Sequence, residues 1–248
     1  MLITNAILIN EGRRFEADLL IRGERIERIA PSIAAPAGEE VFDARGRLLL
    51  PGLIDDQVHF REPGLTAKGD LATESAAAVA GGTTSFMDMP NVNPQTITRA
   101  ALEDKYRIAA GRAHANYAFY MGTTNDNLSE LEALKKGEAC AIKIFMGAST
   151  GNMLVDNPDT LDKIFQRAPV MIVTHCEDTP MIKVAEDAAR EKYGEDVPFS
   201  EHPYIRSAAA CHKSTELAVG LSKLIVEAYR PASLALLPVI GPDQIGRA

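Results

Sequence analysis

The residues best suited to chemistry lie in the stretch Pro51–Gly64, where apolar residues are bracketed by Pro-Gly pairs. This pattern predicts a short buried strand between two turns. Because side chains alternate along a strand, Gln57, His59 and Arg61 are expected to share the face opposite Val58. An amide, an imidazole and a guanidinium at the end of a strand suit a metal and an anion. A solvated strand end with an unrelated histidine is the alternative, and this strand alone does not exclude it.

Two further residues of the same kind lie in later apolar runs. Lys143 is flanked by Ile142 and Ile144, and His175 follows the run 170–174. A lysine in an apolar strand is either ion-paired, extended toward solvent or modified. A lone histidine after an apolar run is more often a hydrogen-bonded structural residue than a ligand. The two residues are therefore candidates whose role depends on what surrounds them.

The chain from residue 52 onward alternates predicted strands with predicted helices. Strands are expected at 83–89, 116–121, 141–146 and 170–175, and helices at 70–80, 98–110, 128–136, 160–166, 180–193 and 211–221. Such alternation indicates a parallel sheet with right-handed crossovers. Polar residues stand at the ends of several strands, namely His59, Asn91, Lys143 and His175. This distribution favours an α/β fold of the (β/α)8 TIM-barrel type over an open sheet with one binding crevice.

Residues 1–51 follow a different pattern, with short apolar runs separated by turn residues. Strands are expected at 2–9, 17–21, 26–29, near 41 and at 48–50, and the first three form two hairpins. These runs predict a small β-sheet domain. It contains no constellation of catalytic residues.

Composition limits the partners of the chain. Its 248 residues are 46% hydrophobic and carry a net charge of -8 with no long basic run. A nucleic acid or an anionic membrane is therefore an unlikely partner, and a small polar substrate fits better. The chain begins without a basic, apolar leader pattern, so we expect a cytoplasmic protein. Three widely spaced cysteines argue against a disulfide framework.

Five motifs occur in order along the chain. They are Pro-Gly-Leu-Ile-Asp-Asp-Gln-Val-His-Phe-Arg-Glu-Pro-Gly, Ala-Gly-Gly-Thr-Thr, Met-Pro-Asn-Val-Asn-Pro, Ile-Lys-Ile-Phe-Met-Gly and His-Cys-Glu-Asp. With these motifs the sequence resembles the dihydroorotases of the cyclic amidohydrolase superfamily, whose relatives include hydantoinases and allantoinases. The resemblance extends from the N-terminus to about Leu221.

The resemblance implies a (β/α)8 barrel with a binuclear metal centre, usually zinc, and a small β-sandwich built from both ends of the chain. Residues 1–51 would supply strands of the sandwich, and residues 52–222 the first part of the barrel. His59 and His175 would be metal ligands, and Lys143 would be the carboxylated lysine that bridges two zinc ions. Carboxylation replaces an ammonium, which cannot bind a cation, by an oxygen donor that suits zinc alongside imidazole.

The resemblance also implies a substrate. Arg61 and Asn91 match positions that bind the substrate carboxylate in dihydroorotases, and a guanidinium binds a carboxylate through two charge-assisted hydrogen bonds. For Arg61 the alternative is a structural salt bridge to Glu62. The implied reaction is the reversible hydrolysis of dihydroorotate to N-carbamoyl-aspartate in pyrimidine biosynthesis, by attack of a metal-activated water on the ring carbonyl.

The sequence departs from the family pattern in two places. Gln57 stands where the family has a first histidine, and because an amide oxygen is a weak zinc ligand, we expect one looser or missing metal. Beyond residue 222 the family's sixth-strand histidine and its catalytic aspartate are absent, so no catalytic residue is identified. We expect an incomplete barrel of five to six βα units with exposed edges. Residues 223–248 form an atypical tail. Codons permitted for Glu227–Leu234, read one nucleotide later, also permit a sequence close to the missing sixth-strand motif, and a frameshift is therefore a hypothesis for the tail.

Three functions remain open on these grounds. The first is a zinc-dependent dihydroorotase, of doubtful activity in a short chain. The second is a hydantoinase-like or allantoinase-like cyclic amidase. The third is a noncatalytic dihydroorotase-like subunit that binds an enzyme of the pyrimidine pathway, and a homo-oligomer is a further expectation.

Overall fold

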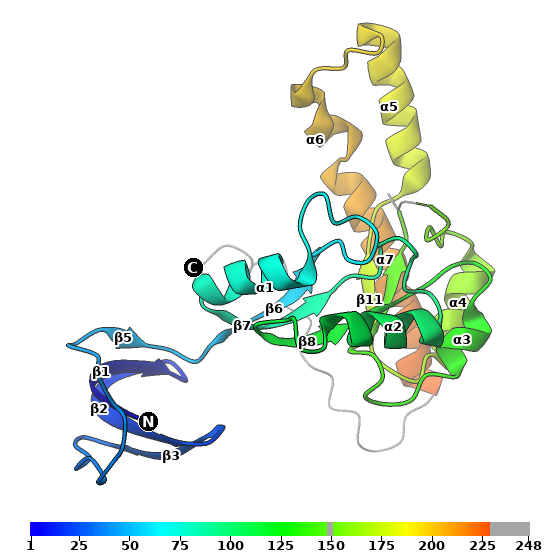
Figure 1. Ribbon diagram of the computed structural model, residues 1–248. Helices are drawn as coiled ribbons and strands as arrows, with labels where there is room; N and C mark the ends of the chain where they lie inside the picture. Colours follow the sequence, from blue (N-terminus) through cyan, green and yellow to red (C-terminus); the bar gives the residue numbers. More distant parts are fainter. Residues whose placement is uncertain (148–150, 229–248) are drawn as a thin grey trace. The chain divides into compact units, whose positions relative to one another are not determined.

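The computed structural model describes residues 1–147 and 151–228 (Figure 1). The chain divides into two compact units. The first comprises residues 1–54 and 78–85, and the second comprises residues 55–77 and the described residues from 86 onward. No helix in these described ranges is both long enough and apolar enough to cross a membrane.

The first unit contains a five-stranded sheet. Its strands are β1 (Leu2–Asn10), β2 (Arg13–Arg22), β3 (Arg25–Ala30), β4 (Val41–Asp43) and β5 (Leu48–Leu49). The order is β3-β2-β1-β4, and β5 also pairs with β1. The β1–β2 and β2–β3 pairs are antiparallel hairpins, as predicted. Glu11 and Gly12 both have positive φ, the conformation that a tight hairpin turn requires.

From residue 53 to residue 193 strands and helices alternate as the sequence predicts, except that the expected strand at 116–121 is two strands and the expected helix at 128–136 ends at Glu132. In chain order they are β6 (Leu53–Val58), α1 (Leu71–Ala80), β7 (Thr83–Asp88), α2 (Arg99–Ala109), β8 (Asn116–Phe119), β9 (Met121–Gly122), α3 (Leu128–Glu132), β10 (Ile142–Phe145), α4 (Pro158–Arg167), β11 (Ile172–His175), α5 (Thr179–Tyr193), η1 (Phe199–Glu201), α6 (His202–Ile205) and α7 (Ala208–Ala228). Two three-stranded sheets have the orders β6-β7-β8 and β11-β10-β9.

The two three-stranded sheets meet at Tyr120, the single residue between β8 and β9. The Tyr120 N–H donates to Asp88 O of β7 at 3.2 Å, and the next residue, Met121, donates to Ala141 O at 3.1 Å. The pairs β9–β10 and β10–β11 are parallel. One run of strands therefore extends from β6 to β11 with helices in the crossovers, which is the partial barrel architecture that the sequence predicted.

The helices begin where capping residues satisfy the first backbone N–H groups. The Thr98 side chain accepts from Ala101 N at the start of α2, and Asn157 accepts from Asp159 N and Thr160 N at the start of α4. The last described helix, α7, continues to Ala228, past the predicted boundary at residue 222. Residues 229–248 lie outside the described residues, and they include most of the segment to which the frameshift hypothesis applies.

The structure corrects the predicted burial of β6. Leu53 is 57% exposed and Ile54 is 68% exposed. In the described sheet order β6 is an end strand, so one of its edges has no described neighbour. Apolar side chains on an edge strand lose the lateral cover that a closed barrel provides. The strand prediction was right, but its burial depends on long-range neighbours.

Candidate functional site

Lys143 lies in the buried strand β10. The residue is only 2% exposed, and its Nζ lies 5.3 Å from the centre of the Phe145 ring. Among the described residues it forms no ion pair or hydrogen bond through Nζ. Burial lowers the pKa of the Lys143 amine, and Cys176 opposes this shift. Within the described residues, Lys143 is therefore neither ion-paired nor directed toward solvent, and both of these predicted alternatives are wrong.

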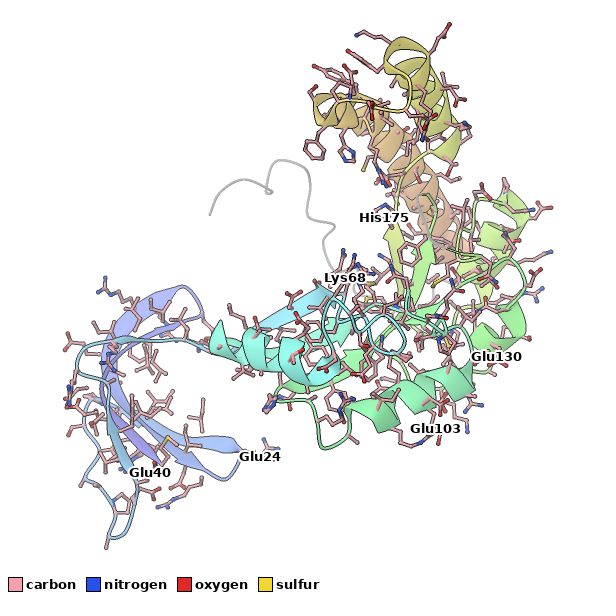
Figure 2. The ribbon with its side chains drawn as sticks, turned by 45° about the horizontal axis from the view of Figure 1, so that its top comes forward. Glu24, Glu40, Lys68, Glu103, Glu130 and His175 are labelled. Atoms are coloured by element: carbon pink, nitrogen blue, oxygen red, sulfur yellow. The ribbon has the colours of Figure 1, made fainter. Side chains whose placement is uncertain are left out.

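His175 ends β11 on the same face of the sheet as Lys143. Lys143 pairs with Val173 and Phe145 pairs with His175 in parallel register. Side chains two residues apart point to one face, and partners in adjacent strands do as well. The Phe145 and His175 ring centres are 6.2 Å apart. Figure 2 shows the labelled His175 at the end of β11.

The other contacts of His175 fix its orientation. Its Nε2 lies 2.7 Å from Glu177 Oε2, and Arg206 binds both oxygens of Glu177, with its Nε donating to Oε1 at 2.8 Å. Arg206, followed by His175, lowers the pKa of Glu177 to about 2. A charged carboxylate only accepts hydrogen bonds, so Nε2 carries the proton. Nδ1 is then the nitrogen of a neutral His175 that keeps a lone pair for a metal.

A pH-dependent prediction follows for Arg206→Met. Glu177 has a lowered pKa in the folded chain, so its contribution to stability is present above its ordinary pKa of 4.5 and is lost as pH falls toward about 2. The variant should therefore be less stable than the wild type at neutral pH, and the difference should shrink as the pH drops through this window. Urea unfolding at a series of pH values measures it. Arg190→Met, at an exposed ion pair on α5, is the control and should show no such trend.

His59 follows the end of β6 and lies among other predicted site residues. Burial lowers the pKa of its imidazole, and the charges of Arg61 and Lys143 lower it further, whereas the adjacent Asn91 side chain raises it. Asn91 Oδ1 is buried and has no hydrogen bond of standard geometry among the described residues. Arg61, Asn91 and Lys143 therefore each lie close enough to His59 to affect its charge, although the four residues come from three separate strand ends.

Arg61 is not held by its neighbouring acid. Glu62 Oε1 accepts from Arg112 Nη1 at 2.7 Å, and Glu62 Oε2 accepts from Leu71 N at 2.9 Å. Among the described residues Arg61 has no ion pair, so the predicted alternative of an Arg61–Glu62 salt bridge is wrong. Arg61 itself has φ +67°. Its guanidinium is thus left without a described carboxylate partner beside His59.

The loop that carries Arg61 packs closely on the loop after β7. Asn93 N donates to Pro63 O at 3.0 Å, and a Cβ added to Gly64 would lie 1.8 Å from Asn93 O. We expect Gly64→Ala to destabilise the chain by about 2 kcal/mol more than Gly111→Ala. Both glycines have positive φ, but a Cβ on Gly111 meets nothing within 4 Å. Chemical denaturation of the two variants measures the difference, and equal losses would contradict the close packing.

Gln57 differs from the prediction in its setting. It is exposed on β6, and that strand ends at Val58. The strand alternation predicted to place Gln57, His59 and Arg61 on one face therefore stops before His59. The backbone beyond Val58 is set by a tertiary contact instead, since Asp88 Oδ1 accepts from Phe60 N at 3.0 Å. A contact between Gln57 and a metal stays a prediction.

Sequence reasoning missed three residues that support the site. Asp88 and Lys105 form an ion pair of 2.8 Å in which both side chains are fully buried. The Tyr120 hydroxyl donates to Asp56 O of β6 at 2.7 Å, and burial raises the pKa of this hydroxyl to about 12. The sequence pattern could have indicated that Lys105 is buried, because it lies on the same face of α2 as the buried Leu102 and Ala109. A lysine on an apolar helix face needs a buried partner.

The donor set fits a metal in its chemistry. Within the described residues no group of three or more His, Cys, Asp and Glu side chains could hold a metal ion. The predicted set is of a different kind, with two imidazoles and one lysine. Among the described residues, the buried amine of Lys143 has no hydrogen-bond or ion-pair partner, Nδ1 of His175 has no hydrogen bond, and Asn91 Oδ1 has no hydrogen bond of standard geometry. His59, a carboxylated Lys143 and His175 would be the residues to hold a metal, and this set stays a prediction.

Comparison with known proteins places these residues in a family. The amidohydrolase family profile matches residues 48–220. A dihydroorotase from Methanosarcina acetivorans is 31% identical over 217 residues, which cover 86% of this chain and 45% of the relative. An allantoinase from Deinococcus radiodurans is 33% identical over 199 residues, which cover 77% of this chain and 43% of the relative. The chain thus spans about half the length of the curated relatives it matches.

Solved structures give the same fold. An L-hydantoinase from Arthrobacter aurescens superposes with a TM-score of 0.84 at 25% identity, covering 90% of this chain and 50% of that one. A dihydropyrimidinase from Brevibacillus agri superposes with a TM-score of 0.78 at 29% identity, with the same coverage of both chains. Relatives that act on several cyclic amides share this architecture, so the fold does not choose among their substrates. On the match over residues 48–220, the chain belongs to the amidohydrolase family.

Proposed function

We propose that this chain carries the metal-binding and substrate-binding residues of a dihydroorotase. The reaction is the reversible hydrolysis of the ring amide of dihydroorotate to N-carbamoyl-L-aspartate, in pyrimidine biosynthesis. The observation that carries the proposal is Arg61, a guanidinium beside His59 that has no described carboxylate partner. Dihydroorotate presents a carboxylate to such a group, whereas a hydantoin or dihydropyrimidine ring does not.

The residues have separate roles in this proposal. Arg61 binds the substrate carboxylate and Asn91 orients it through its side-chain amide. His59, carboxylated Lys143 and His175 hold zinc, with two ions expected in each full-length subunit and Gln57 as a weaker contact. When bound, zinc supplies a Lewis acid for the ring carbonyl and acidifies water to a pKa of roughly 7. Glu177 keeps the His175 ring in place by accepting a hydrogen bond from its Nε2–H.

Carboxylation of Lys143 is consistent with the burial of its amine. The neutral amine attacks carbon dioxide, a C–N bond forms and a proton leaves, so an ammonium must first lose its proton. Burial lowers the pKa of the Lys143 amine and so favours the neutral form. The product carries a carboxylate, which supplies the oxygen donors that the free amine lacks.

A second candidate is a hydantoinase-like or allantoinase-like amidase. It is favoured by the structural similarity to the L-hydantoinase and by the allantoinase relative. A third candidate, a noncatalytic subunit, is favoured by Gln57 in place of the expected histidine. A homo-oligomer, a pyrimidine-pathway enzyme as partner and a cytoplasmic location stay predictions.

Turnover of dihydroorotate, hydantoin and allantoin, measured together with zinc content, distinguishes the candidates. The proposal expects bound zinc and, of the three substrates, turnover of dihydroorotate alone, either by this chain or only by the extended one described below. Turnover of hydantoin or allantoin instead would support the second candidate. A folded, purified sample with no zinc and no turnover would support the third. A matched sample extended by the reading frame downstream of residue 222 tests whether activity needs the later family motifs.

A further inference from the structure

The buried ion pair of Asp88 and Lys105 connects three parts of the second unit. Asp88 ends β7, Lys105 lies in α2, and both side chains are 0% exposed with Nζ and Oδ2 2.8 Å apart. Lys105 Nζ also donates to Met89 O at 2.8 Å. The other carboxylate oxygen, Asp88 Oδ1, accepts from Phe60 N at 3.0 Å. The pair therefore reaches the backbone between His59 and Arg61.

In the part of the chain that the structure describes, the Phe60 amide has no backbone acceptor on a neighbouring strand. At the ends of β6 and β7, Met89 N donates to Val58 O at 3.0 Å, and β6 ends at Val58. Asp88 Oδ1 takes the place of the next backbone acceptor. The Phe60 ring packs against Phe86 at 4.6 Å between centres, which holds the side chain but not the backbone amide.

The pair is a costly way to stabilise a fold. Burial lowers the pKa of the Lys105 ammonium, because desolvation disfavours its charged form. Apolar residues of similar volume often replace a buried ion pair with little loss of stability. The geometry offers a different role, because Lys105 holds one carboxylate oxygen and leaves the other directed at Phe60 N.

We propose that the Asp88–Lys105 pair is a positioning device that fixes the backbone at Phe60 and thereby the placement of His59 and Arg61. This inference rests on the proposed function, in which Arg61 binds a carboxylate. Asp88 and Lys105 act through the backbone and touch neither substrate nor metal. The carboxylate oxygen that accepts from Phe60 is the part that matters for positioning, and the charges serve to hold it.

Two double variants separate the acceptor from the charges. Asp88→Asn with Lys105→Met removes both charges but keeps a side-chain oxygen for Phe60 N. Asp88→Ala with Lys105→Met removes the charges and the oxygen. Hydrogen exchange of the Phe60 amide and calorimetric binding of N-carbamoyl-L-aspartate are the two readouts, with chemical denaturation to compare stability.

We expect the Asn variant to keep slow exchange at Phe60 and near wild-type binding. The Ala variant should lose protection at Phe60 and bind at least about tenfold more weakly, because Arg61 is then no longer held in place for the ligand carboxylate. Equal behaviour of the two variants, in either direction, would overturn the proposal. Should neither double variant fold, rapid exchange of the Phe60 amide in the wild-type chain would overturn it, and slow exchange would support it.

The two proposals fail in different ways. If the wild type does not bind N-carbamoyl-L-aspartate but the variants still differ in exchange at Phe60, the positioning role stands and the proposed substrate is wrong. If the wild type binds and the variants exchange alike, the substrate stands and the positioning role is wrong.

Discussion

Lys143→Ala should remove most of the bound zinc and reduce turnover of dihydroorotate by on the order of a thousandfold or more. The side chain is buried in β10 without a described partner, and the proposal makes it the bridging oxygen donor once carboxylated. Alanine removes the amine and cannot be carboxylated. Metal analysis and turnover of the purified variant measure both effects.

The control for this prediction is Lys68→Ala, a substitution of an exposed lysine in the loop before α1 (Figure 2). It should keep wild-type zinc content and turnover. Labelled bicarbonate adds a direct test, because the wild type should incorporate the label at Lys143 and Lys143→Ala should not. Full zinc content in the alanine variant, or no label in the wild type, would show that Lys143 does not bridge metals.

Arg61→Ala should weaken binding of dihydroorotate and of N-carbamoyl-L-aspartate by about a hundredfold. Because the guanidinium has no described carboxylate partner in the chain, its removal should mainly reduce the free energy of ligand binding. A charge-assisted pair contributes about 1.5–3 kcal/mol. Arg61→Lys should recover only part of the affinity, because an ammonium cannot bind two carboxylate oxygens in a planar fork. Calorimetry with each ligand gives the values.

Arg107→Ala is the matched control, since Arg107 is exposed on α2 and pairs with Asp104 one turn away. Its affinity for both ligands should equal that of the wild type. Zinc content should remain unchanged in all three arginine variants. Unaltered affinity in Arg61→Ala would remove the reason to prefer dihydroorotate and would favour a hydantoinase-like substrate instead.

Much of this fold could be read from the sequence because its signals are local. Apolar runs separated by glycine and capping residues predicted the strands from β7 to β11, with β8 and β9 expected as one strand, and Thr98 marks the start of α2 in both sequence and structure. The residue types at strand ends identified His59, Lys143 and His175 as candidates. These features depend on neighbouring residues along the chain, so an isolated sequence contains them.

The sequence therefore determined the order of elements and the identity of the candidate ligands. Only the tertiary structure decided that β6 is exposed, that Glu62 pairs with Arg112 so that Arg61 has no carboxylate partner among the described residues, and that Asp88 holds Phe60. Each of these depends on a residue distant in the chain or on which strands flank a sheet edge. Burial and charge pairing are set by neighbours in space, and periodicity along the chain does not specify them.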